Sequence, residues 1–217
     1  MKLSTLPFYH TLTASGRSIL EQHLKPLSCS KGQLIHGSGE DAYGMIYVEE
    51  GTLSVVLPSE DGREVSLFRL RKGEFCFLTA SPSITGLSFD IMIEAESDAK
   101  LLGLPNSSLE HMMKKQDAFS AFVRESIAES FSRTVRFLEK ILFCTFDQRL
   151  AIYLYEETLS TGSLTLHLTH EQIARHIGSA REVVSRALKR FSSLGIVSVS
   201  RGCIKILDKT ALKRASR

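Results

Sequence analysis

Short apolar runs separated by glycine-containing turns fill the chain between Gly32 and Leu104. The runs are rich in β-branched and aromatic residues, which is typical of strands. They predict strands at Gln33–His36, Met45–Val48, Thr52–Leu57, Glu64–Leu70, Met92–Glu94 and Lys100–Leu104. The dipeptide Asp61-Gly62 between two of these runs favours a hairpin turn, because glycine accepts the positive φ that such turns need. Evenly spaced short strands indicate a small barrel or roll.

After Pro105 the pattern changes from strand to helix. No glycine follows Gly103 until Gly162, and we expect one helix from Ser107 to about Phe143. Positions at alternating four- and three-residue steps form the seam of a two-stranded coiled coil: Ile127, Phe131, Thr134, Leu138 and Ile141. This seam predicts a homodimer. Because it covers only two heptads, the alternative is that the stripe packs on the β-domain.

The last third of the chain has the pattern of a helix-turn-helix with a wing. We expect a helix at Arg149–Glu157, a Ser/Thr/Gly turn through Gly162, a short strand at Leu164–Leu168, two helices and a terminal hairpin. The fold class is therefore α+β. The expected division is a β-roll at 1–106, a dimerisation helix and hinge at 107–146, and a winged helix-turn-helix at 147–217.

The segment Thr169–Phe191 carries the strongest functional pattern. Thr169 and Gln172 form a capping box that begins the first helix. Ala174 is small where two helices must approach, Gly178 permits the positive φ of a tight turn, and Val184 packs the second helix on the first. This spacing of small residue, glycine and aliphatic residue is typical of a helix-turn-helix.

The second helix of this segment alternates an apolar and a polar face. Residues near the amino end of such a helix reach base edges in the major groove, and its flanks meet phosphates. The alternative reading of the polar face is an ordinary solvated surface. We predict base contacts by Arg181, Glu182, Ser185 and Arg186, and phosphate contacts by Thr169, His170, Ser179, Lys189 and Arg201.

The distribution of charge along the chain supports a DNA contact by the C-terminal part alone. The whole chain carries a net charge of +3, and 43% of its residues are hydrophobic, enough for a real core. From Asp147 to Arg217 there are twelve Lys/Arg against six Asp/Glu, whereas the rest of the chain has fifteen against eighteen. Basic charge concentrated at one end is expected where one domain meets phosphates and the other does not.

Several segments together resemble the CRP/FNR family of bacterial transcription regulators: Lys31–His36, Gly51–Val56, Asp61–Glu64, Gly73–Phe75 and Arg181–Arg186. The resemblance covers nearly the whole chain. It implies a β-roll like a cyclic-nucleotide-binding domain, a long dimerisation helix, a hinge near Phe146-Asp147 and a winged helix-turn-helix. It also implies that Glu182 and Arg186 read a G·C and a neighbouring pair of each half-site. Arg181 is similar to the cyclic-AMP branch of the family, and Ser185 to its oxygen-sensing branch.

The effector does not carry over from this resemblance. Phe89-Asp90 stands where cyclic-AMP-binding members have an Arg-Ser pair that holds the phosphate, so cyclic AMP is not expected to bind. The iron–sulfur branch needs a cysteine cluster before the roll, where only Cys29 stands, and no histidine has the context of a haem ligand. We predict no metal site, and the cofactor stays unknown. Within the cassette that starts at Gly73, the effector candidates are Cys76, Thr79 and Ser81.

Two other classes compete with a DNA-binding regulator. One is a cyclic-nucleotide-binding-like signalling module tethered to a partner, which the recognition helix disfavours. The other is a metal-dependent β-barrel enzyme, which needs closely spaced histidines on one strand that this chain lacks. We therefore expect no enzyme. We expect a cytoplasmic protein, because no signal peptide or membrane span is evident. The expected partners are double-stranded DNA with an inverted repeat, a second copy of the chain and RNA polymerase. Glu156–Ser163 is the candidate contact for the polymerase, and the alternative is an ordinary polar loop.

Overall fold

The computed structural model describes residues 3–35, 43–77 and 91–217. Two compact units make up the chain. The N-terminal unit comprises Met1–Pro58 and Leu67–Thr134, and the C-terminal unit comprises Ser59–Ser66 and Val135–Arg217. Each unit has its own buried apolar core.

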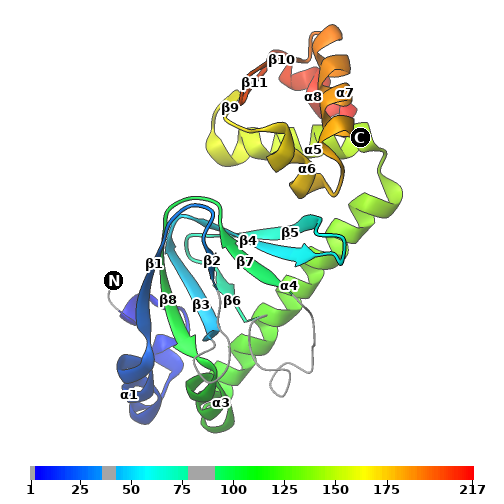
Figure 1. The fold of residues 1–217 in the computed structure, drawn as a ribbon. Coiled ribbons are helices and arrows are strands. Elements are labelled where there is room, and N and C mark those ends of the chain that lie inside the picture. Colours follow the sequence, from blue (N-terminus) through cyan, green and yellow to red (C-terminus); the bar gives the residue numbers. More distant parts are fainter. Residues whose placement is uncertain (1–2, 36–42, 78–90) are drawn as a thin grey trace. The chain divides into compact units, whose positions relative to one another are not determined.

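Two four-stranded sheets form the roll of the N-terminal unit (Figure 1). One has the order β1-β8-β3-β6 and the other β2-β7-β4-β5. The strands of the first are β1 (Lys25–Cys29), β8 (Ala99–Pro105), β3 (Tyr43–Glu50) and β6 (Phe75–Cys76). Those of the second are β2 (Leu34–Ile35), β7 (Met92–Ala95), β4 (Thr52–Pro58) and β5 (Glu64–Arg71). Gly62, with a φ of +77°, lies in the turn between β4 and β5 as the Asp61-Gly62 pattern predicts.

Helices that precede and follow the strands in the sequence cover part of the core of the roll. The short turns η1 (Leu3–Thr5) and η2 (Tyr9–Thr11) and the helix α1 (Ala14–His23) precede the strands. The helices α3 (Asn106–Lys115) and α4 (Asp117–Phe143) follow them. Apolar side chains from α1, α3, α4 and the segment before α1 meet in one buried cluster that includes Phe8, Leu20, Met112, Phe119 and Val123.

The prediction of one helix from Ser107 to Phe143 is wrong at Gln116. Gln116 has extended dihedrals, φ −131° and ψ 91°, and separates α3 from α4. Its buried side chain donates to the Thr13 hydroxyl at 2.8 Å and accepts from the Thr13 amide at 3.2 Å. Because this partner lies 103 residues away, helical periodicity does not reveal the break.

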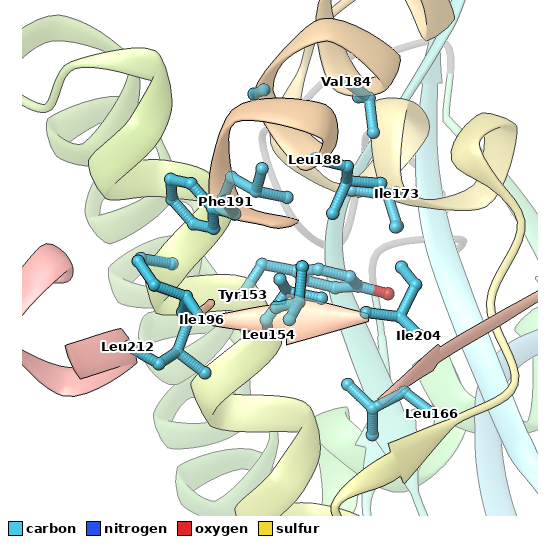
Figure 2. Close-up of a cluster of buried hydrophobic side chains, with 14 of the residues drawn as sticks. Tyr153, Leu154, Leu166, Ile173, Val184, Leu188, Phe191, Ile196, Ile204 and Leu212 are labelled. Atoms are coloured by element: carbon cyan, nitrogen blue, oxygen red, sulfur yellow. The ribbon is translucent and has the colours of Figure 1, made fainter. Parts of the chain in front are cut away.

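The C-terminal unit is a compact winged helix-turn-helix. Its elements are α5 (Phe146–Thr161), β9 (Thr165–Leu166), α6 (His170–Ile177), α7 (Arg181–Ser193), β10 (Val197–Ser200), β11 (Cys203–Ile206) and α8 (Lys209–Ala215). The strands form one antiparallel sheet with the order β10-β11-β9. Figure 2 shows the core, in which side chains from α5, α6, α7 and α8 and from the sheet converge: Tyr153, Leu154, Leu166, Ile173, Val184, Leu188, Phe191, Ile196, Ile204 and Leu212.

The α+β class, the roll and the winged helix-turn-helix are confirmed. The sequence patterns missed α1, β1, β6 and α8, which are short or lack periodicity. In the part of the chain that the structure describes, no helix is long and apolar enough to span a membrane.

Candidate nucleic-acid interface

The turn between α6 and α7 has the geometry that the sequence predicts. Thr169 caps α6: its hydroxyl accepts from the Gln172 amide at 3.2 Å, and the Gln172 side chain accepts from the Thr169 amide at 2.8 Å. Gly178 ends α6 in the left-handed region with φ 62° and ψ 57°. The Ser179 amide donates to the Ala174 carbonyl at 2.9 Å, and this hydrogen bond closes the turn before α7 begins. The capping box and the glycine turn are therefore confirmed.

The apolar face of α7 fixes the helix in the core. Val184, Ala187, Leu188 and Phe191 are at most 2% exposed, and Ala174 of α6 is equally buried where the two helices meet. The polar residues of α7 therefore lie on the face of the helix that points away from the core.

The opposite face of α7 is polar and open. Arg181, Glu182, Arg186 and Lys189 are exposed, and Ser185 is half-buried between them. Among the described residues, none of these five side chains has an ion-pair or hydrogen-bond partner. The guanidinium and carboxylate groups are thus free to meet an external partner, and a helix of this width fits the major groove of B-DNA.

The residues predicted to meet phosphates occupy three places around α7. Thr169 is exposed at the start of α6, but its hydroxyl already caps that helix. His170 and Ser179 are half-buried, at the first position of α6 and in the turn. Arg201 is exposed at the turn between β10 and β11, where Gly202 has a φ of +70°. These positions lie on the same unit as α7.

One basic residue of α7 has a different role, which sequence reasoning missed. Arg190 forms an ion pair with Asp147 in the first turn of α5. A second residue with an internal role is His176, whose ring stacks on Tyr153 with centroids 5.3 Å apart. No periodicity in the sequence indicates either contact, because the partners lie on different helices.

In the roll, the carboxylate of Glu74 is engaged within the protein. One oxygen accepts from the Arg133 guanidinium of α4 at 2.7 Å, and the other accepts from the Arg71 amide at 2.6 Å. The Arg133 side chain also donates to Glu129 at 2.7 Å and to the Arg69 carbonyl at 3.3 Å. The Gly73-Glu74 turn of the cassette is therefore attached to α4.

The remaining effector candidates are only partly described. Cys76 lies in β6 with 1% exposure, inside an apolar cluster with Ile46 and Leu101. Thr79, Ser81, Phe89 and Asp90 lie outside the described residues, as does His36. Among the described residues, no three His, Cys, Asp or Glu side chains are arranged to hold a metal ion.

The second half of α4 exposes an apolar stripe. Of the predicted seam, Phe131 is 62% and Leu138 is 49% exposed. Ile127, Thr134 and Ile141 are half-buried, and the Thr134 hydroxyl donates to the Ser130 carbonyl of its own helix at 3.1 Å. The structure adds Val135 at 37% and Leu142 at 71% exposure, which continue the stripe at four- and three-residue steps.

Comparison with known proteins matches both units to one kind of regulator. Residues 26–116 match the model of the cyclic nucleotide-binding domain, and residues 148–215 match that of the Crp-like helix-turn-helix domain. The structure of a Crp/Fnr-family transcriptional regulator from Eubacterium rectale ATCC 33656 is 34% identical, with a TM-score of 0.92 over 97% of this chain and 98% of the other.

Two more distant relatives have the same organisation. The cAMP-activated global transcriptional regulator CRP of Pasteurella multocida is 25% identical over 78% of this chain and 83% of its own length. The c-di-GMP responsive regulator CLP of Xanthomonas campestris is 16% identical, with a TM-score of 0.75 over 90% of this chain and 100% of the other. At that identity the likeness to CLP shows the fold alone.

The two units thus define a DNA-binding regulator with a cyclic-nucleotide-binding-like domain. The chain belongs to the CRP/FNR family of transcription regulators, as its sequence motifs predicted. Members of this family are not enzymes, so the competing interpretation as a metal-dependent enzyme is excluded.

Proposed function

We propose that the protein is a homodimer that reads an inverted repeat in double-stranded DNA with its two α7 helices. The observation that carries this proposal is the open polar face of α7, with Arg181, Glu182 and Arg186 exposed and without internal partners among the described residues. Two-fold symmetric helix-turn-helix dimers read half-sites whose centres lie about one helical turn apart. We expect a TGA core in each half-site.

Base readout rests on Arg186 and Glu182, with Arg181 and Ser185 beside them. Arginine donates in bidentate fashion to guanine, and glutamate accepts from cytosine. Selection of bound sites from random duplexes should return a palindrome. Arg186→Ala should cost about 1–3 kcal/mol per half-site and flatten the preference at its guanine. A selection without a palindrome, or an Arg186→Ala variant with unchanged preference, would contradict the proposal.

Lys189 is the matched control for Arg186, because it is exposed on the same helix one turn from the base-reading residues. We assign Lys189 to the phosphates together with Thr169, His170, Ser179 and Arg201. Lys189→Ala should weaken binding to all sequences alike and reduce the salt slope by about one per contact. A change of sequence preference in Lys189→Ala would place this lysine among the base-reading residues.

The dimer interface is assigned to the exposed stripe of α4. Ile127, Phe131, Thr134, Leu138 and Ile141 are the predicted seam, and the exposure of Val135 and Leu142 adds these two residues to it. Exposed apolar side chains at heptad spacing are stabilised when a second helix covers them. Light scattering on the purified protein at micromolar concentration should give the mass of a dimer.

The effector acts through the roll, and we propose that it is not cyclic AMP. Glu74 already accepts from Arg133 and Arg71, and the sequence has Phe89-Asp90 in place of the phosphate-binding pair. The relatives from P. multocida and X. campestris respond to different nucleotides, so family membership does not select one. Calorimetry with cyclic AMP should show no binding, and saturable micromolar binding would overturn this part of the proposal.

Four further assignments complete the proposal. The functional segments are 1–106, 107–146 and 147–217, and the protein acts in the cytoplasm. RNA polymerase is the expected protein partner, through the exposed residues of Glu156–Ser163, since Glu157 and Thr158 of this segment are buried in α5. Cys76, Thr79 and Ser81 remain the effector candidates in the cassette, although the burial of Cys76 requires the roll to open before an oxidant reaches its sulfur.

A further inference from the structure

The joint between α4 and α5 is short and well defined. The helix α4 ends at Phe143, and α5 begins at Phe146 with Thr145 as its cap, so only Cys144 and Thr145 lie between them. The Thr145 amide donates to the Gln148 side chain at 2.8 Å, and the Gln148 amide donates to the Thr145 hydroxyl at 3.3 Å. Val135–Phe143 of α4 belongs to the same compact unit as α5.

Arg149 of α5 closes this joint from one side. Its guanidinium donates to the Ile141 carbonyl at 3.2 Å, and that carbonyl lies in the last turn of α4, where helices have unpaired acceptors. The same guanidinium lies 5.9 Å from the centre of the Phe146 ring, which packs on the core of the unit. A surface pair between Lys140 and Glu156, 2.8 Å apart, adds a second contact between the two helices.

Arg190 and Asp147 continue the connection from α5 to α7. Arg190 lies one helical turn beyond Arg186, yet its side chain pairs with Asp147 in the first turn of α5 and is not left free. Asp147 is well placed there, because a carboxylate is favourable near the amino end of a helix. The helix α5 is therefore joined to the end of α4 through Arg149 and to the recognition helix through Asp147.

We propose that Asp147 and Arg190 are positioning residues that hold α7 at a fixed angle to α5, whose start is joined to the end of α4, and thereby set the half-site spacing that the dimer accepts. The inference rests on the proposed function, since spacing has meaning only for a dimer that reads two half-sites. The Arg190 and Asp147 side chains are 54% and 37% exposed, and exposed ion pairs contribute little to folding stability. Their loss should therefore change spacing preference more than it changes the unfolding temperature.

The test measures affinity of the full-length protein for duplexes that carry two selected half-sites, at the selected spacing and with one or two base pairs added or removed. Arg190→Gln and Asp147→Asn remove the ion pair, and Arg190→Lys keeps its charge. Lys189→Gln is the matched control, because it removes the same charge from the neighbouring position of α7. Unfolding temperature and salt slope are measured for each variant.

We expect Arg190→Gln and Asp147→Asn to reduce the discrimination between the best and the altered spacings by about three- to tenfold, as loss of a weak orienting contact in each subunit allows. Their salt slopes and unfolding temperatures should match the unmodified protein. Arg190→Lys should retain most of the discrimination. Lys189→Gln should lose affinity at every spacing alike, with a lower salt slope.

Three results would overturn the inference. If Arg190→Gln behaves like Lys189→Gln, with equal loss at all spacings and a lower salt slope, then Arg190 meets phosphate and does not position α7. If the unmodified protein binds one half-site as tightly as two at any spacing, the proposed dimeric reading fails and the inference fails with it. If the unmodified protein has a sharp spacing preference and both Arg190→Gln and Asp147→Asn keep it, then these residues do not position α7. The proposed dimeric reading of DNA would still stand.

Discussion

The two units of this protein present their functional groups in opposite ways. In the C-terminal unit, Arg181, Glu182 and Arg186 are exposed and have no internal partner among the described residues. In the N-terminal unit, Glu74 of the cassette is bound by Arg133 and Arg71, and Cys76 is buried in the core. A surface that reads DNA must keep its polar groups free, whereas a domain that responds to an effector can hold such groups in contacts that the effector changes.

The first prediction compares the reaction rates of cysteine thiols in the two units, for which we expect the largest difference. Cys76 is buried, and burial also raises the pKa of the Cys29 thiol, so less of it is thiolate at a given pH. Cys203 in β11 is half-exposed. Alkylation of the native protein at pH 8 should label Cys203 at least about a hundredfold faster than Cys29 or Cys76, which react only after local opening. Mass spectrometry of the labelled peptides measures the rate at each cysteine. Fast labelling of Cys76 would contradict the prediction and show that an oxidant can reach its sulfur.

The second prediction tests the stripe on α4. Phe131→Asp places a charge in the centre of the proposed interface, where burial of two unpaired carboxylates opposes association. The variant should be monomeric by light scattering and should lose about a hundredfold or more of its affinity for a palindromic duplex, because each half-site is then bound separately. Ser132→Asp, on an exposed neighbouring position, should remain dimeric. If the Phe131→Asp variant is still dimeric, the dimer interface does not lie on this stripe of α4.

The third prediction tests whether the two cores are separate. Leu188 and Leu101 are fully buried leucines in the C-terminal and N-terminal units. Truncation of either to Ala should cost about 2–5 kcal/mol of unfolding free energy in its own unit. Hydrogen exchange, followed peptide by peptide, should show Leu188→Ala weakening protection in α5–α8 and Leu101→Ala weakening it in the roll. Equal loss of protection in both units would mean that they unfold as one.

The fourth and smallest effect concerns the contact of Glu74 with Arg133. The two side chains are 32% and 22% exposed, so the pair is intermediate between surface and buried pairs. Glu74→Gln should lower the unfolding free energy of the N-terminal unit by about 1–2 kcal/mol. Glu129→Gln, which removes only the exposed pair within α4, should cost at most about 0.5 kcal/mol. Equal effects of the two substitutions would show that the cassette is not attached through Glu74.

The helix-turn-helix could be predicted almost residue by residue, because its constraints are local. A capping box at Thr169, a positive φ at Gly178 and the two faces of α7 all depend on residues a few positions apart. The strands β1 and β6 and the helix α8 were missed because their stability comes from partners distant in sequence. The pairing of Cys76 with Ile46, for example, joins β6 to β3 across thirty positions of the chain.

Hydrophobic spacing, turn residues and charge distribution were enough by themselves to predict two kinds of domain and the polar face of α7, and the family followed from the resemblance of short motifs. Packing alone settled which polar groups are free. Arg186 and Arg190 look equivalent along α7, yet only the fold brings Asp147 within reach of Arg190. Likewise, the break at Gln116 and the contact of Glu74 with Arg133 depend on side chains from distant segments meeting in space. Such contacts leave no periodic pattern in the sequence, because each joins a single pair of residues far apart in the chain. The local sequence around either residue does not determine its partner.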